Sequence, residues 1–336
     1  MTDIQTRDRS LRPGDLVVVK SAEEIIATLD EDGRLDGLPF MPEMLRFCGR
    51  TMIVHKTAKV TCGGRADLRE MDNAVFLTGV RCDGAAHDGC QARCLIHWKE
   101  AWLERVDGDS VRALPGPGGD LHPGQPDRSL LPLIAPTTKD TPDAAPRYLC
   151  QATEILDATS PLPFTRLSQY PHHVRNWGLW RLVKVMLVAL VNKYQLTSRR
   201  LPRMLRIKDG RTFPMLAGTL QSTPSAADEL QPGDRVRIKS RAEIEATLDT
   251  NNANRGLIFD VEELRFCGQT ATVLQRVERI IDERSGEMIT IGSDAYMLDG
   301  VVCPGDYHRL CARGIYSYWR SVWLEKLDPS DAPTDR

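Results

Sequence analysis

The chain contains an internal duplication, which constrains its fold more than any other feature of the sequence. Residues 11–30, LRPGDLVVVKSAEEIIATLD, match residues 230–249, LQPGDRVRIKSRAEIEATLD, and the same offset of 219 residues continues without a gap to residues 51 and 270. Beyond a variable stretch the offset becomes 221, at which WLERV (102–106) matches WLEKL (323–327). Two copies of one domain therefore flank a different middle region.

Each copy predicts a small β-rich domain with one short helix near its start. The turn PGD is followed by an alternating strand, LVVVK or RVRIK. Ser21 and Ser240 then have the character of helix N-caps, because Glu24 and Glu243 follow three residues later, as in a capping box. After CGRT and CGQT the pattern returns to strand.

The second copy resembles the SH3-like barrels of the KOW type and of the nitrile hydratase β subunit, through PGDRVRIK followed by GQTATVLQRV. The resemblance covers about half of each repeat. It implies a small β-barrel and no activity, since nothing in the chain matches a nitrile hydratase metal loop. The expected fold class is β-rich with an α-helical middle, in which two repeated SH3-like small barrels flank a helical segment.

Each copy also carries the element Cys-x4-His-x2-Cys, in GVRCDGAAHDGC (79–90) and GVVCPGDYHRLC (300–311). Three cysteines and one histidine recur at matched positions of the two copies: Cys48, Cys82, His87 and Cys90, and Cys267, Cys303, His308 and Cys311. Three thiolates and one imidazole form a ligand set typical of closed, structural zinc sites, which predicts two zinc ions. The same residues are also suited to an iron–sulfur cluster of the 4Fe-4S type.

Other interpretations of these residues stay open. Cys94 follows Cys90 by four residues and could replace or supplement a ligand, whereas the matched position is Ile315. The matched cysteines could equally be buried thiols beside a surface histidine. Trp98 and Trp102, like their counterparts in the second copy, are four residues apart and would share one face of a helix. We expect them to pack on the barrel, with an exposed aromatic patch as the alternative.

The pattern divides the chain into five regions: repeat A (1–106), a Pro/Gly-rich linker (107–147), a helical, basic middle region (148–228), repeat B (229–328) and a tail (329–336). The linker holds eight of the 21 prolines. Helices are expected over residues 148–160 and 173–196.

The helix over 177–196 is apolar on most faces, which predicts burial in a domain core or in contacts between copies of an oligomer. From 170 to 212 there are ten Lys or Arg residues and one acidic residue, Asp209. Residues 193–212 are thus a candidate surface for an acidic protein or an anionic membrane. Nucleic acid is a weaker candidate, because the net charge of the chain is only −2.

Three functions follow from these features. The first is a metal-stapled binding or scaffold protein; the second is a redox or biosynthetic enzyme with iron–sulfur clusters. The third is a transferase or hydrolase in which Cys150 is the nucleophile and His172 or His173 the base. Without an apolar run long enough to span a membrane or a secretory signal, we expect a cytoplasmic protein, with membrane-peripheral association as the alternative. Whether the protein is an enzyme is left open.

Overall fold

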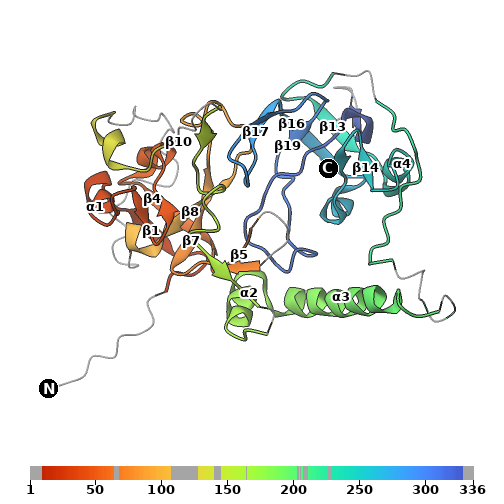
Figure 1. The fold of residues 1–336 in the computed structure, drawn as a ribbon, viewed down its shortest axis with the longest axis horizontal. Coiled ribbons are helices and arrows are strands. Elements are labelled where there is room, and N and C mark those ends of the chain that lie inside the picture. The colour runs from red at the N-terminus through yellow and green to blue at the C-terminus, as the bar shows by residue number, and fades with distance from the viewer. Residues whose placement is uncertain are drawn as a thin grey trace, which may run out of the picture. The chain divides into compact units, whose positions relative to one another are not determined.

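The structure is a computed structural model (Figure 1). It describes residues 10–63, 68–106, 128–139, 145–163, 165–202, 204, 206, 211–225 and 229–327. Most of the predicted linker, part of the basic segment 193–212 and the tail lie outside these residues. The chain forms two compact units: unit 1 comprises Met1–Gly178, Ile281–Met288 and Cys311–Arg313, and unit 2 comprises Leu179–Ile280, Ile289–Leu310 and Gly314–Arg336.

Unit 1 is built on an antiparallel five-stranded sheet in which the last strand returns beside the first. The strand order is β8-β7-β4-β1-β9. The strands are β1 (Leu16–Val19), β4 (Thr51–Thr57), β7 (Ala74–Arg81), β8 (Leu95–Lys99) and β9 (Leu103–Arg105). The other elements are α1 (Ala22–Ile26), β2 (Arg34–Leu35), β3 (Leu38–Pro39), η1 (Pro42–Phe47), β5 (Val60–Cys62), β6 (Leu68–Glu70), η2 (Glu100–Trp102), η4 (Arg128–Leu133), β10 (Thr138–Lys139), β11 (Arg147–Tyr148), β12 (Ser160–Pro161) and α2 (Gln169–Trp177).

Unit 2 contains an antiparallel four-stranded sheet in the order β19-β16-β13-β20. Its strands are β13 (Arg235–Ile238), β16 (Thr270–Arg276), β19 (Tyr296–Leu298) and β20 (Leu324–Lys326). The remaining elements of unit 2 are α3 (Leu179–Ser198), α4 (Arg241–Glu245), β14 (Ala253–Asn254), β15 (Leu257–Ile258), η7 (Val261–Phe266) and η8 (Ser321–Trp323). The short strands β17 (Arg279–Ile281) and β18 (Met288–Thr290) each have residues assigned to both units.

The two sheets agree in strand register as well as in strand order. Leu16 of β1 lies opposite Ile53 of β4, and the corresponding Arg235 of β13 lies opposite Thr272 of β16. Both β4 and β16 also shift register at the same point, between Val54 and Lys56 and between Val273 and Gln275 respectively. The sequence repeat therefore extends to the pairing of individual residues and to a shared irregularity.

The capped helices form as predicted in both copies. The hydroxyl of Ser21 accepts a hydrogen bond from the amide of Glu24, and the amide of Ser21 donates to the Glu24 carboxylate at 2.9 Å. Ser240 and Glu243 form the same reciprocal capping box at the start of α4. Each box satisfies two of the amides that a helix start leaves without an intrahelical partner.

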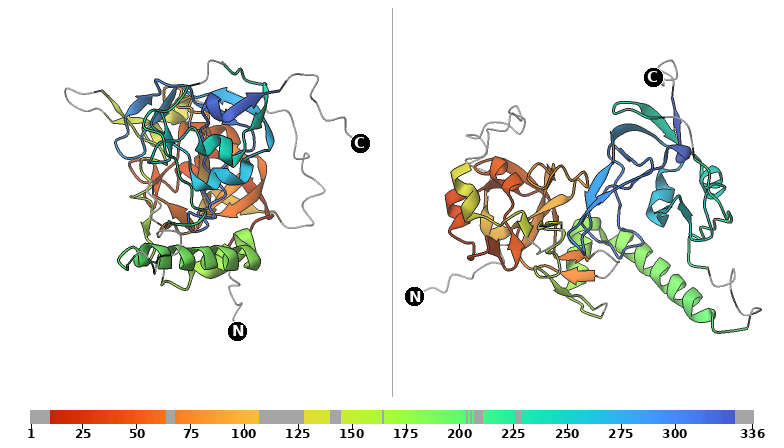
Figure 2. Two further views of the ribbon diagram at one scale, coloured as in Figure 1. Left: turned by 90° about the vertical axis from the view of Figure 1, so that its right-hand side faces the viewer. Right: turned by 45° about the horizontal axis from the view of Figure 1, so that its top comes forward.

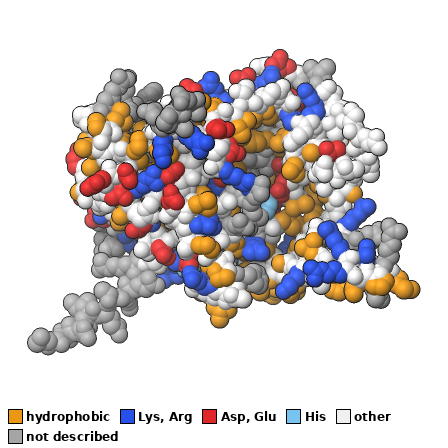
Figure 3. Space-filling model, viewed as in Figure 1, with side chains coloured by type: hydrophobic (Ala, Val, Ile, Leu, Met, Phe, Trp, Pro, Cys, Tyr) orange, Lys and Arg blue, Asp and Glu red, His pale blue; other side chains and the backbone are white. Residues whose placement is uncertain are grey.

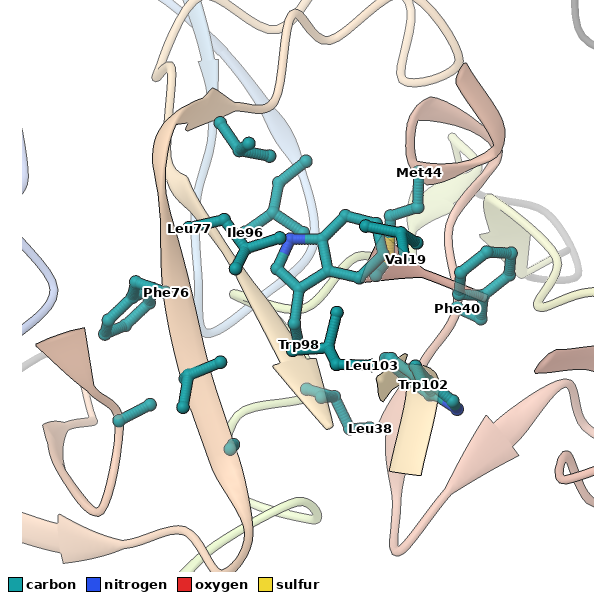
Figure 4. Packing of buried hydrophobic residues seen from close by; sticks show 14 of the residues in the cluster. Val19, Leu38, Phe40, Met44, Phe76, Leu77, Ile96, Trp98, Trp102 and Leu103 are labelled. Carbon is teal, nitrogen blue, oxygen red and sulfur yellow. The ribbon is translucent and has the colours of Figure 1, made fainter. Parts of the chain in front are cut away.

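The paired tryptophans lie in the cores of the two units. Trp98 stands on β8 and Trp102 at the end of η2, so a strand and a short 3-10 turn, rather than one helix, carry them. Both are fully buried, and the ring of Phe40 meets each of them edge-on (Figure 4). Phe259 makes the same contacts with the buried Trp319 and Trp323 of unit 2. The tryptophans therefore form no exposed aromatic patch.

The middle region departs from the predicted helices. Residues 148–160 form turns between the short strands β11 and β12 instead of a helix. The longer helical stretch divides into α2 and α3 at Gly178, whose φ of +80° suits glycine. Figure 2 shows α3 as one straight helix. No helix in the described part of the chain is long and apolar enough to cross a membrane.

The expected burial in a domain core is wrong for most apolar residues of α3, whereas burial between copies of an oligomer stays a prediction. A stripe of them at helical spacing is exposed: Trp180, Val183, Leu187, Leu190, Val191 and Tyr194. Trp180 retains 85% of its surface and Leu187 58%. Only four side chains of the helix are buried, among them Leu182 and Val185. The periodicity of the sequence predicts an apolar helix. It cannot tell whether the apolar stripe is buried or exposed, because both have the same residue spacing.

Candidate metal centres

Unit 2 brings a carboxylate, a thiol and an imidazole together at one point. Ligand atoms of Glu262, Cys303 and His308 all lie within 4.8 Å of one another. Nδ1 of His308 is 3.5 Å from Sγ of Cys303 and 3.8 Å from Oε1 of Glu262. A single ring nitrogen thus faces both of the other donors, which is the arrangement needed to share one ion.

The short helix η7 and the loop after β19 position these donors. Asp260 caps η7: its carboxylate accepts a hydrogen bond from the amide of Glu262. The amides of Tyr307 and His308 donate to Oε1 of Glu262, at 2.5 Å and 3.2 Å. The other oxygen, Oε2, is buried and has no hydrogen-bond partner among the described residues. A buried carboxylate oxygen without a donor is costly, and a cation would satisfy it.

The second nitrogen of His308 has a carboxylate partner. Its Nε2 lies 3.4 Å from Oδ2 of Asp260. Metal-binding histidines commonly donate the opposite N–H to a carboxylate or a carbonyl, which fixes the ring and leaves the first nitrogen for the ion. Hydrogen bonds to Asp260 and Cys303 raise the pKa of His308 to about 11, so a metal would displace a proton from this ring.

Unit 1 repeats the arrangement with Glu43 of η1 and with Cys82 and His87 of the loop after β7. These ligand atoms also lie within 4.8 Å of one another. Nδ1 of His87 is 2.6 Å from Oε1 of Glu43, and Sγ of Cys82 is 3.7 Å from the same oxygen. Oε2 of Glu43, like Oε2 of Glu262, is buried without a hydrogen-bond partner among the described residues.

His87 also has a partner for its second nitrogen, here a carbonyl. Nε2 lies 2.9 Å from the carbonyl oxygen of Leu149, which can only accept, so Nε2 carries the proton. Burial acts against a charged His87 ring, but the hydrogen bond to Glu43, the charge of Glu43 and the hydrogen bond to Leu149 together outweigh it and raise the pKa of His87. The side chains of Glu43 and His87 are both 2% exposed, whereas His308 is 31% exposed. The first site is therefore closed and the second partly open.

Of the eight predicted ligands, four belong to these triads: Cys82, His87, Cys303 and His308. Cys48 and Cys267 cap the ends of η1 and η7 and stand outside both triads. Burial and the charge of Glu23 raise the pKa of Cys48 to about 11; burial and Glu263 do the same for Cys267.

The last two predicted ligands lie elsewhere in unit 1. Sγ of Cys90 accepts a hydrogen bond from the amide of Ile281 at 3.4 Å. Cys311 lies against Cys62, with 3.0 Å between the sulfurs. The two cysteines at matched positions in the sequence therefore have different surroundings.

Cys150 lines a cavity of unit 1, and neither His172 nor His173 lines it. Burial raises the pKa of Cys150, which disfavours the thiolate that a nucleophile needs. Sequence reasoning missed Glu43 and Glu262. Their signal was present, because they are acidic residues at matched positions of the repeat, but many surface acids are matched as well. Their burial distinguishes them.

Comparison with known proteins gives no identification of this chain. No family model matches it, and no curated protein and no solved structure matches it either. Its function must therefore be argued from the two clusters themselves.

Proposed function

We propose that this protein is a binding or scaffold protein whose two repeated SH3-like domains are each stapled by a metal ion. The observation that carries the proposal is the recurrence of one Glu-Cys-His triad, at matched positions, in both units. In each triad the carboxylate has one satisfied and one unsatisfied oxygen, and the imidazole has a partner behind it. The returning last strand of each sheet supports a small barrel.

Zinc is the ion that fits this donor set best. It accepts thiolate, imidazole and carboxylate together in tetrahedral sites, whereas calcium and magnesium require oxygen ligands. The role we assign to it is structural, since each triad joins the short helix η1 or η7 to a distant loop. Binding free energy at such a site becomes folding free energy.

Unit 2 offers the sharpest test. Cys303→Ser and His308→Ala should each lower the zinc content by one equivalent per chain and lower the melting temperature. Cys267→Ser is the matched control, since burial raises the pKa of Cys267 as it does that of Cys303, but Cys267 stands outside the triad. Unchanged zinc in the first two variants would refute the triad. Loss of zinc in Cys267→Ser would instead support the ligand set predicted from the sequence, with three cysteines and one histidine.

A second candidate function is attachment to anionic membranes through α3. The exposed apolar stripe of α3 lies beside the exposed Lys184 and Lys193, and Arg199 and Arg200 follow its end. Figure 3 shows hydrophobic and basic side chains adjoining one another where Figure 1 places α3. A helix with this composition lies in the membrane interface, where its apolar face is buried and its cations meet lipid headgroups.

Vesicle co-sedimentation tests this function. The protein should bind vesicles that contain phosphatidylserine, and the double variant Trp180→Ser, Leu187→Ser should not. Ile258→Ser is the control, because Ile258 is as exposed as Leu187 but lies on β15. Equal binding by all three proteins, or no binding to anionic vesicles at all, would exclude α3 as a membrane anchor. If the molar mass of the protein in solution rises with protein concentration, the apolar stripe of α3 serves self-association instead.

A further inference from the structure

Unit 1 contains a cavity lined by four cysteines. Its volume is about 40 Å³, more than a single water molecule needs. The cysteines are Cys82, Cys90, Cys94 and Cys150. Only Cys82 belongs to a triad, so three of these thiols have no role in the metal centres described above.

The fold brings the four thiols together from two segments. Cys82 follows β7 and Cys94 precedes β8, and the amide of Cys82 donates to the carbonyl of Cys94 at 2.9 Å. Cys90 lies on the loop between them. Cys150 comes from the segment after β11, which Gln151 fixes to β8 by accepting from the amide of His97 and donating to its carbonyl. The four residues thus stand on well-supported backbone.

These thiols are too widely spaced for one ion. In a tetrahedral zinc site the sulfurs are ~3.8 Å apart, which follows from zinc–sulfur bonds of about 2.3 Å. Within the described residues, the two Glu-Cys-His triads are the only sets of three ligand atoms that approach within 4.8 Å of one another. In an iron–sulfur cluster the cysteines bind different iron atoms, so their sulfurs face a common space without meeting at a point.

The surroundings of the cavity suit an anionic cluster. The amide of Ile281 donates to Sγ of Cys90, and hydrogen bonds of this kind stabilise cluster-bound thiolates. Arg313 also lines the cavity, with its charge paired to the carboxylate of Glu283 at 2.6 Å. His97 also lines it and is 3% exposed, yet neither ring nitrogen has a hydrogen-bond partner among the described residues. Its N–H is therefore available to a sulfide or a thiolate.

We propose that unit 1 holds an iron–sulfur cluster bound by Cys82, Cys90, Cys94 and Cys150. This refines the proposed function at the first site, because Cys82 serves either the cluster or the triad, and leaves the zinc site of unit 2 unchanged. The second repeat lacks equivalents of two of these ligands: Ile315 replaces Cys94, and Cys150 comes from outside the repeat. The two repeats therefore carry different inorganic centres.

The test is to treat the full-length protein with ferrous iron, ferric iron and sulfide under anaerobic conditions, because clusters of this kind hold part or all of their iron as Fe(III). We expect iron and sulfide to bind in equal amounts and to give a broad absorption band near about 400 nm, as for thiolate-bound clusters. A cluster with two or with four irons satisfies the proposal. Absence of bound iron and sulfide from the wild-type protein overturns it, whatever the variants do.

Variants locate the centre. Cys94→Ser and Cys150→Ser should lose the absorption band and keep the zinc of unit 2, which shows that the chain is folded. Cys48→Ser, from the same unit, and Cys303→Ser, from unit 2, should keep the band. A band retained in both Cys94→Ser and Cys150→Ser would exclude the cavity as the cluster site. A protein that binds two zinc ions and no iron would overturn this inference and leave the proposed function intact. A protein that shows the iron–sulfur band but binds no zinc would support this inference and overturn the proposed function.

Discussion

The indole Nε1 of Trp323 donates a hydrogen bond of 2.9 Å to the hydroxyl of Thr247, at the centre of unit 2. The corresponding pair in unit 1, Trp102 and Thr28, makes the same bond at 3.0 Å. Each threonine hydroxyl in turn donates to a carbonyl of the preceding helical turn, that of Ile244 or Ile25. One threonine thus connects the core tryptophan to the capped helix in both copies.

Replacing Thr247 with valine should therefore destabilise unit 2. The change keeps the side-chain shape but leaves a buried indole N–H without an acceptor, which costs about 1–3 kcal/mol. Urea denaturation measures the loss. Thr272→Val is the control, since Thr272 is exposed on β16 and valine suits a strand. Equal stability of the two variants would show that the tryptophan bond contributes nothing.

The loop of the first metal site gives a second prediction, because it contains two glycines with nearly the same backbone conformation. Gly84 has φ of +72° and Gly89 of +73°. A Cβ at Gly84 would overlap the carbonyl oxygen of Cys90, whereas a Cβ at Gly89 would meet nothing within 4 Å.

Gly84→Ala should consequently distort the loop that carries His87, whose amide donates to the carbonyl of Gly84, and reduce the metal content of unit 1. Gly89→Ala pays only the conformational penalty of alanine at positive φ, about 1 kcal/mol. The test is to measure the metal content per chain of the two purified variants and of the wild-type protein. If both variants bind metal equally, the close approach of Gly84 to Cys90 has no bearing on the site.

The carboxylate behind His308 gives a third prediction. Asp260→Asn removes the charge facing Nε2 of His308 but retains a good N-cap for η7. Loss of such a supporting carboxylate weakens metal binding by about 10–100-fold. Competition with a chromogenic chelator measures the change. Asp306→Asn is the control, because Asp306 pairs instead with Arg181 and Arg265. A similar affinity loss in both variants would indicate a general effect of negative charge.

His173 of α2 gives a prediction for the dependence of stability on pH. Burial, together with the neighbouring His172, lowers the pKa of His173 from 6.5 to about 4. Below pH 6.5 His173 is therefore protonated in the unfolded chain but stays neutral in the folded chain. The free energy of unfolding consequently falls as the pH drops from 6.5 towards 4. The loss reaches at most about 3 kcal/mol, since each pKa unit corresponds to about 1.4 kcal/mol.

His173→Phe should flatten this part of the pH profile. Free energies of unfolding measured from pH 7 to pH 4 should fall less steeply for the variant than for the wild-type protein. His172 stays in place in both proteins, so its own titration contributes to both curves. Parallel curves would mean that His173 is protonated equally in the folded and unfolded chains.

Local features were predictable from the sequence alone. The strands after PGD, the capping boxes at Ser21 and Ser240, and the proximity of Cys82 to His87 each depend on a few neighbouring residues. Turn, cap and loop geometry are set over such short distances, so spacing is informative about them.

Contacts between distant segments were not predictable in this way. Glu43 reaches His87 only because η1 packs beside the loop after β7, and that position is set by the core around Trp98. Cys48 has the same matched status in the repeat as Cys82, yet it caps η1 away from the triad. Repetition shows which residues are retained in both copies, and it does not show which of them meet.

Each triad also defines a closed loop of chain, from Glu43 to Cys82 in unit 1 and from Glu262 to Cys303 in unit 2. The two-residue difference in length between the repeats falls inside this loop. The entropy of closing a loop grows only with the logarithm of its length, so two added residues cost less than ~0.1 kcal/mol. Insertions between the ligands are thus nearly neutral for the cross-link, and this segment is where descendants of the duplicated domain are freest to diverge in length.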